Sequence, residues 1–215
     1  MKQTNIFAVG DSHSIYYFDS NIVNHHWVGW GGGMPVTMYQ LLIKGLPLYN
    51  IVERLQPGDI CKINIKENDV VLFFYGWNDI QKNIYKYGNN NYKNLIDNMT
   101  TNYVKLIKDF SNGVLYKIKP IISCIYPIPQ NINNEIVGSK EDRITYTLYM
   151  NERLKCLCLE NNIPFFDIYD LLQDDNIISS RVVDNDKTHL DRKNINLREK
   201  IEPLLLDLIN TNYKN

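Results

Sequence analysis

Short runs of mainly apolar residues recur along the chain and predict the strands of a buried sheet. A continuous apolar run of this length is typical of a strand that is covered on both of its faces. A weaker strand is predicted at 26–28, where Gly29 to Gly33 interrupt the pattern almost at once. The clear runs cover 6–9, 70–75, 121–126 and 164–168.

Longer stretches with apolar residues at helical spacing lie between these runs, at 36–44, 92–110, 140–160 and 194–210. Ser139 with Asp142 three residues later resembles a helix-opening cap, because the hydroxyl can accept an unpaired backbone N–H of the first turn. Buried strands that alternate with helices predict a mainly parallel sheet covered on both faces. We therefore expect one three-layer α/β/α domain over 1–215, with about five strands in a flavodoxin-like arrangement.

Composition and charge narrow the classes of protein to which the chain can belong. It is 44% hydrophobic and 22% charged, as a globular domain is. A formal net charge of -1 provides no long-range field, so neither nucleic acid nor a membrane is an expected partner. The first apolar run is too short for a signal peptide or a membrane span, and we expect a cytoplasmic location. The four cysteines lack C-x-x-C spacing and are expected to be reduced thiols.

Polar segments follow the predicted strands, and these segments hold the candidate chemistry. In an open parallel sheet, ligands bind beyond the carboxyl ends of the strands, where loops bring distant residues together. The segments cover 10–14 after the first run, 76–79 after the second run, and 184–190 near the end of the chain. Each of them supplies at least one group that is useful in catalysis.

Three motifs in these segments resemble the sequence blocks of the SGNH or GDSL-type hydrolases. They are G-D-S at 10–12, G-x-N-D at 76–79 and D-x-x-H at 186–189, in the order that the family has. Each motif is weak alone, but the three in order, each after the expected element, make a strong joint signal. The resemblance spans most of the chain. It implies an α/β/α hydrolase with Ser12 as nucleophile and with Asp186 and His189 completing a catalytic triad.

The same residue types fit ester chemistry on physical grounds. A serine hydroxyl is a poor nucleophile at neutral pH, so Ser12 needs a base within hydrogen-bond reach and that base needs an orienting partner. His189 can take the serine proton and return it to the leaving alcohol, while Asp186 accepts the other imidazole N–H. The alternatives are structural: Ser12 as a helix cap, Asp186 as a turn residue and His189 as a surface histidine.

The oxyanion of a tetrahedral intermediate needs hydrogen-bond donors that are fixed in advance. The candidates are the Asn78 side chain, the backbone N–H of Ser12 and the backbone N–H of a glycine. Among the glycines that precede the first predicted helix we favour Gly33, with Gly32 as the alternate. The donor should lie just before that helix, where Pro35 suits the first turn.

Four further residues are candidates for lining the substrate pocket: Asp11, His13, Trp30 and Trp77. The aromatic face of Trp30 or Trp77 can stack on a sugar ring or an acyl group, although buried packing is an equal alternative. His13 can line the pocket or have a structural role, and it is too close to Ser12 in sequence to be its base. Asp11 and Asp79 also suit local hydrogen bonds that stabilise their loops.

The sequence therefore predicts a serine-dependent ester hydrolase that needs no cofactor. His25 and His26 have no partner at metal-ligand spacing, so no metal is expected. The expected substrates are small-molecule or glycan esters with a small acyl group such as acetate, and the family resemblance suggests carbohydrate O-acetyl or simple lipid esters. Two alternatives stay open: an O-acyltransferase with the same triad, and a non-catalytic glycan-binding module on the same fold.

Overall fold

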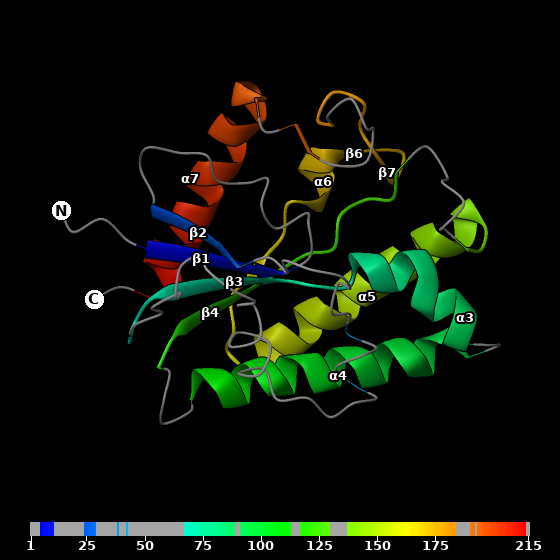
Figure 1. Cartoon of the computed structure of the whole chain (residues 1–215), viewed down its shortest axis with the longest axis horizontal. Helices are drawn as coiled ribbons and strands as arrows, with labels where there is room; N and C mark the ends of the chain where they lie inside the picture. The colour runs from blue at the N-terminus through cyan, green and yellow to red at the C-terminus, as the bar shows by residue number, and fades with distance from the viewer. Residues whose placement is uncertain are drawn as a thin grey trace, which may run out of the picture.

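A five-stranded parallel sheet forms the centre of the protein, with helices on both of its faces (Figure 1). The computed structural model describes residues 5–10, 24–28, 38, 42, 67–88, 91–112, 117–129, 137–183, 190–191 and 193–213. All neighbouring strands pair in parallel, which confirms the predicted fold. The strands lie in the order β2 (Asn24–Val28), β1 (Asn5–Gly10), β3 (Val70–Phe74), β4 (Lys119–Ser123) and β5 (Phe165–Phe166).

Two hydrophobic clusters hold the three layers together. Successive side chains of a strand point to opposite faces of a sheet. Val71 and Phe73 of β3 therefore pack toward α4 (Tyr92–Ser111) and α5 (Lys140–Glu160), while Leu72 faces α7 (Ile195–Asn212) on the other side. Every residue of β3 is at most 1% exposed. This burial on both faces explains why the strand is an uninterrupted apolar run.

Most elements begin and end close to the positions predicted from the sequence. The structure confirms α4, α5 and α7, and the weaker strand at 26–28 is β2 at the edge of the sheet. In the predicted helix at 36–44, the described residues Met38 and Leu42 are helical. The Ser139 cap is also confirmed, because its hydroxyl accepts the Asp142 N–H at 3.0 Å.

Several local elements differ from the sequence prediction. The predicted strand at 121–126 is β4, which ends at Ser123 and leaves Tyr126 in the segment beyond the sheet. Helical structure that was not predicted begins directly after β3, as η2 (Asp79–Asn83) and α3 (Ile84–Gly88). A short helix and hairpin also follow β5. They are α6 (Tyr169–Leu172), β6 (Gln173–Asp174) and β7 (Ile177–Ile178).

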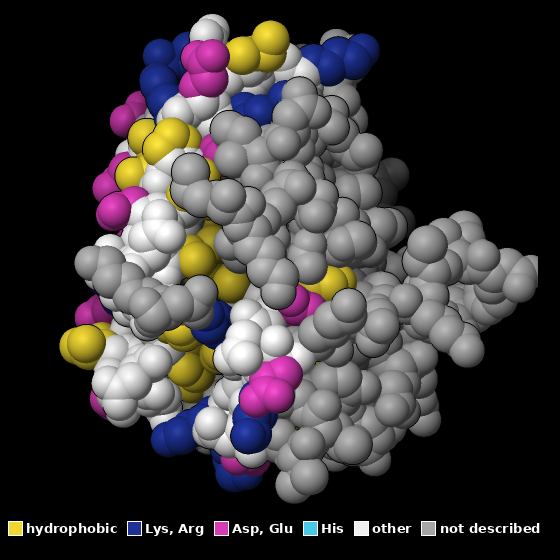
Figure 2. Space-filling model, turned by 90° about the vertical axis from the view of Figure 1, so that its left-hand side faces the viewer, with side chains coloured by type: hydrophobic (Ala, Val, Ile, Leu, Met, Phe, Trp, Pro, Cys, Tyr) yellow, Lys and Arg dark blue, Asp and Glu magenta, His cyan; other side chains and the backbone are white. Residues whose placement is uncertain are grey.

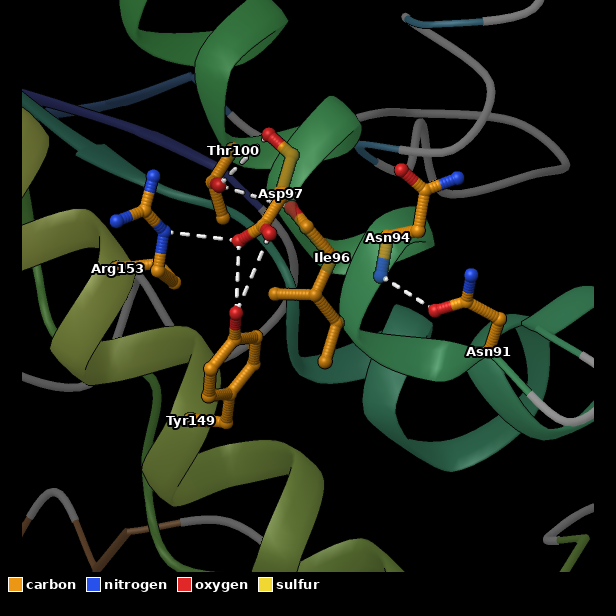
Figure 3. A network of polar contacts seen from close by, with 7 residues as sticks. All are labelled: Asn91, Asn94, Ile96, Asp97, Thr100, Tyr149 and Arg153. Carbon is orange, nitrogen blue, oxygen red and sulfur yellow. Dashed lines mark hydrogen bonds and ion pairs between the residues drawn. The ribbon is translucent and has the colours of Figure 1, made fainter.

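A polar network joins α4 to α5 on the sheet face opposite α7 (Figures 1 and 3). The Asp97 carboxylate accepts the Tyr149 hydroxyl at 3.0 Å, and its Oδ1 lies 2.8 Å from Arg153 Nε. The Asp97 and Arg153 side chains are 39% and 33% exposed, so water screens the pair and its contribution is about 0 to 1 kcal/mol. Apolar packing therefore provides most of the attraction between the two helices.

Charged side chains of both signs are interspersed over the described part of the face drawn in Figure 2. Some of the exposed charges form ion pairs, such as Arg181 with Asp174 at 2.7 Å and Lys155 with Asp167 at 3.2 Å. No helix in the described part of the chain is both long and apolar enough to cross a bilayer.

Candidate active site

The first motif begins where β1 ends against β3. Gly10 pairs with Phe74, the last residue of β3. A Cβ atom at position 10 would lie 2.0 Å from the Phe74 carbonyl oxygen, so this position accepts only glycine. The glycine of G-D-S thus lets the two strands end side by side. Asp11 and Ser12 follow it in sequence and lie outside the described residues.

The glycine of the second motif turns the chain from β3 into a helix. Gly76 has a φ of +117°, which side chains rarely adopt, and a Cβ atom there would lie 2.6 Å from Ile125 Cδ1. Its carbonyl oxygen accepts the Ile80 N–H at 3.0 Å, as in a helical turn. Trp77 and Asn78 are therefore placed just beyond the carboxyl end of β3.

Asn78 occupies a position that suits the predicted oxyanion donor. It precedes η2, and its side chain makes no capping hydrogen bond to that helix. The residue is partly exposed at the edge of the sheet where ligands of parallel sheets bind. Trp77 next to it is also partly buried and packs against both hydrophobic clusters. Its predicted contact with substrate stays a prediction.

Asp79 connects the second motif to a segment far away in the sequence. The side chain is fully buried, and its Oδ1 accepts the Asn83 amide at 2.8 Å, which is the kind of local bond that the sequence predicted. Its Oδ2 accepts the backbone N–H of Met38 at 2.7 Å. Met38 is helical and follows Gly33 by five positions in sequence, so Asp79 ties this position to the turn that carries Asn78. Sequence reasoning missed this bond, because only the fold brings positions 38 and 79 together.

We expect Asp79→Asn to lower the free energy of unfolding by about 1.5 to 3 kcal/mol, since a buried charge-assisted hydrogen bond is replaced. The asparagine side chain has only one acceptor oxygen. Its NH₂ group would therefore face another donor, either the Met38 N–H or the Asn83 amide. Chemical denaturation followed by circular dichroism measures the change. Asp109→Asn is the matched control, because Asp109 is an exposed partner of Lys105 and its replacement should change the free energy by less than about 0.5 kcal/mol.

The third motif lies between two described residues that pair with each other. Val183 and Leu190 form an antiparallel bridge, and the Asp191 N–H donates to the Val182 carbonyl at 2.9 Å. Leu190 is 1% exposed and belongs to the same hydrophobic cluster as Phe74 at the end of β3. The described residues that flank 184–189 are therefore held in place.

The remaining predicted site residues lie outside the described residues, so their predicted roles stay predictions. They are Asp11, Ser12, His13, Trp30, Gly32, Gly33, Asp186 and His189. The predicted contact between the Ser12 hydroxyl and the His189 imidazole is among these predictions.

A buried thiol also lies at this edge of the sheet. Cys124 directly follows β4, and burial raises its pKa to about 12. Its sulfur accepts the Ile168 N–H at 3.4 Å. The group is therefore a neutral thiol at pH 7 and a poor nucleophile. Within the described segments, no three His, Cys, Asp or Glu side chains are grouped so that they could hold a metal ion.

Comparison with known proteins identifies the fold. No family model and no curated protein matches the sequence. A GDSL-like lipase from Bacteroides thetaiotaomicron is 18% identical with a TM-score of 0.59, and the alignment covers 96% of this chain and 89% of the lipase. The psychrotrophic esterase EstA from Pseudoalteromonas sp. is 17% identical, with a TM-score of 0.53 and coverage of 99% and 100%. An acetyl xylan esterase is 17% identical, with a TM-score of 0.54 and coverage of 94% and 98%. The chain has the α/β/α fold of the GDSL-type lipases and esterases.

Proposed function

We propose that this protein is a serine ester hydrolase that removes small acyl groups through an acyl-serine intermediate. The proposal rests on the structural positions that require glycine at 10 and 76, within the first two motifs. Gly10 lets β1 and β3 end side by side, and Gly76 turns the chain from β3 into the helix that follows. In sequence, the first glycine leads to Ser12 and the second to Asn78. A nucleophile and an oxyanion donor are needed at one edge of the sheet, and these two motifs lead to the same edge.

In the proposed reaction, the Ser12 hydroxyl attacks the acyl carbonyl carbon while His189 takes its proton. Asp186 accepts the other imidazole N–H and stabilises the imidazolium that forms. The tetrahedral intermediate then expels the alcohol, which receives the proton from His189. Water repeats the sequence on the acyl-serine ester and releases the acid.

The negative oxygen of each tetrahedral intermediate is stabilised by donors that do not have to move. The Asn78 amide and the backbone N–H groups of Ser12 and Gly33 are assigned this role, with Gly32 as the alternate glycine. Each such donor contributes about 3 to 4 kcal/mol to transition-state stabilisation in comparable sites. Trp30 and Trp77 are assigned to the walls of the substrate pocket, together with Asp11 and His13.

The proposed substrates are small-molecule or glycan esters with a small acyl group such as acetate. An acetyl xylan esterase has the same fold, which supports a carbohydrate O-acetyl ester. Simple lipid esters are the second member of the proposed substrate class.

A phosphonate probe tests the nucleophile directly. EstA is described as inhibited by monoethylphosphonate, and a fluorophosphonate is expected to label this protein at Ser12 because it is attacked like an ester carbonyl. Mass spectrometry of tryptic peptides should find the adduct in the wild type and in Ser111→Ala, and none in Ser12→Ala.

An unlabelled wild type that still binds acetylated glycans would support the non-catalytic binding module and contradict the proposal. A labelled protein that transfers acetate to added glycans in preference to water would support the acyltransferase. Product analysis by chromatography separates that outcome from hydrolysis, because a hydrolase forms acetate and no new acyl-glycan.

A further inference from the structure

The side chain of Arg143 is buried, and no acidic side chain among the described residues forms an ion pair with it. It lies in the first turn of α5 and is 0% exposed. Within the described segments its side chain makes one hydrogen bond, from Nη1 to the Gly138 carbonyl oxygen at 3.0 Å. The neighbouring Asp142 carboxylate is bound instead to the backbone N–H and the hydroxyl of Ser139. Burying a guanidinium with unpaired donors is costly, because the hydrogen bonds to water are lost without replacement.

The two unpaired nitrogens of Arg143 form a recognition edge. Nε and Nη2 are both buried, and neither has a hydrogen-bond partner in the part of the chain that the structure describes. These two N–H groups lie side by side on one edge of the planar guanidinium and point in the same direction. Such an edge matches the two oxygens of a carboxylate, which is why arginine binds carboxylates in a bidentate manner. The bond from Nη1 to Gly138 holds the group in place, and the Nε and Nη2 edge is not used by it.

A second buried and unpaired side chain borders the same short segment. Gln81 of η2 is 1% exposed, and its amide oxygen and amide nitrogen have no hydrogen-bond partner among the residues that are described. Its backbone carbonyl accepts the Val137 N–H at 3.0 Å, next to the Gly138 carbonyl that accepts Arg143. Gln81 therefore adds a second unpaired polar side chain, a neutral one, at the segment that Arg143 also contacts.

This pair lies close to the candidate active site. Gln81 follows Asn78 by three positions, which places it about one helical turn away on the helix that begins at the end of β3. α5 packs against η2. The Tyr85 ring lies against Gly138, since a Cβ atom at that position would be 2.5 Å from it. Tyr85 is 50% exposed, and exposed side chains change rotamer in picoseconds to nanoseconds, so a rotation of Tyr85 would uncover Gly138.

The geometry points to a carboxylate-binding subsite formed by Arg143 and Gln81 beside the ester-cleaving centre. The preferred ester then carries a free carboxylate, which accepts two parallel hydrogen bonds from Arg143 and a further one from the Gln81 amide. This inference rests on the proposed ester hydrolysis for its catalytic meaning. The binding of a carboxylate can be measured without catalysis.

Two matched substrate pairs test the preference. The first pair is mono-4-nitrophenyl succinate and 4-nitrophenyl acetate, in which the charged member carries the carboxylate in its acyl part. The second pair is acetylated glucuronate and acetylated glucose, in which the charged member carries it in the alcohol part. We expect the wild type to favour the charged member of one pair by at least about tenfold in kcat/KM. Arg143→Lys keeps the charge but loses the bidentate edge, so the charged-to-neutral ratio should fall about tenfold.

Arg153→Lys is the matched control, because Arg153 lies on the same helix but pairs with Asp97. It should leave the charged-to-neutral ratio as it is in the wild type. Gln81→Glu should lower the ratio as well, since its carboxylate repels the substrate carboxylate and can pair with Arg143. This second variant keeps the test decisive if Arg143→Lys does not fold.

Calorimetric titration of Ser12→Ala with sodium succinate, against sodium chloride at equal ionic strength, gives a readout that does not depend on turnover. Saturable succinate binding that is lost in the double variant Ser12→Ala/Arg143→Lys supports the subsite. If neither ester pair is hydrolysed while succinate still binds, only the proposed hydrolase is contradicted. Equal kcat/KM within both pairs together with no succinate binding overturns the subsite and leaves the hydrolase standing.

Discussion

Replacing Ser12 with alanine is expected to lower kcat/KM for 4-nitrophenyl acetate by about a thousandfold or more, because the step that forms the acyl-enzyme loses its nucleophile. His189→Ala should cause a loss of the same order, since the serine hydroxyl is then left without a base. The double variant should be little worse than either single variant, because the two groups act as one unit. Initial rates followed by the release of nitrophenolate measure the loss.

Circular dichroism provides the control for this experiment, as neither variant removes a residue of the described hydrophobic clusters. Asp186→Ala should cost less than Ser12→Ala, because an aspartate that orients the base does not itself attack. A harmless Asp186→Ala would transfer the orienting role to Asp184. Activity like that of the wild type in Ser12→Ala or His189→Ala would refute the triad.

Asn78→Ala is expected to lower kcat by about a hundredfold to a thousandfold while KM changes little. An oxyanion donor acts on the charge that develops in the transition state, so its loss raises the barrier more than it weakens substrate binding. Asn78→Asp should be at least as damaging, because a carboxylate at this position repels the developing negative oxygen. Steady-state kinetics with 4-nitrophenyl acetate separates the two parameters.

Asn98→Ala is the control for the oxyanion donor, since Asn98 is an exposed asparagine on α4. It should leave kcat and KM within about twofold of the wild type. A rise in KM with an unchanged kcat in Asn78→Ala would instead assign Asn78 to ground-state binding and contradict its oxyanion role.

The two arginines of α5 illustrate why part of the candidate site is not visible in the sequence. Arg143 and Arg153 lie on one helix, yet Arg143 is fully buried and Arg153 is a third exposed beside Asp97. Burial depends on what packs against each position, and for Arg143 that includes the segment at 137–138, which is fixed by a bond to Gln81. The spacing of residues along α5 does not indicate which segments pack against each arginine.

The helical structure at 79–88 was missed for a related reason. It starts inside the G-x-N-D motif, shortly after a strand. Gly76 turns the chain there with a positive φ, and the sequence does not specify this backbone conformation. The bond from Met38 to Asp79 was missed as well, because two segments that are distant in sequence meet only when the sheet has formed.

By itself the sequence determined the layered fold, the positions of the main strands and helices, and the motifs that nominate Ser12, Asn78, Asp186 and His189. These follow from local rules, because a strand buried on both faces must be apolar throughout and a capped helix carries its signal in adjacent residues. Only the tertiary structure decided that Gly10 and Gly76 are required by close contacts, that Asp79 binds Met38, and that Arg143 is buried. Each of these features is a contact between segments far apart in the chain, and such contacts exist only after folding.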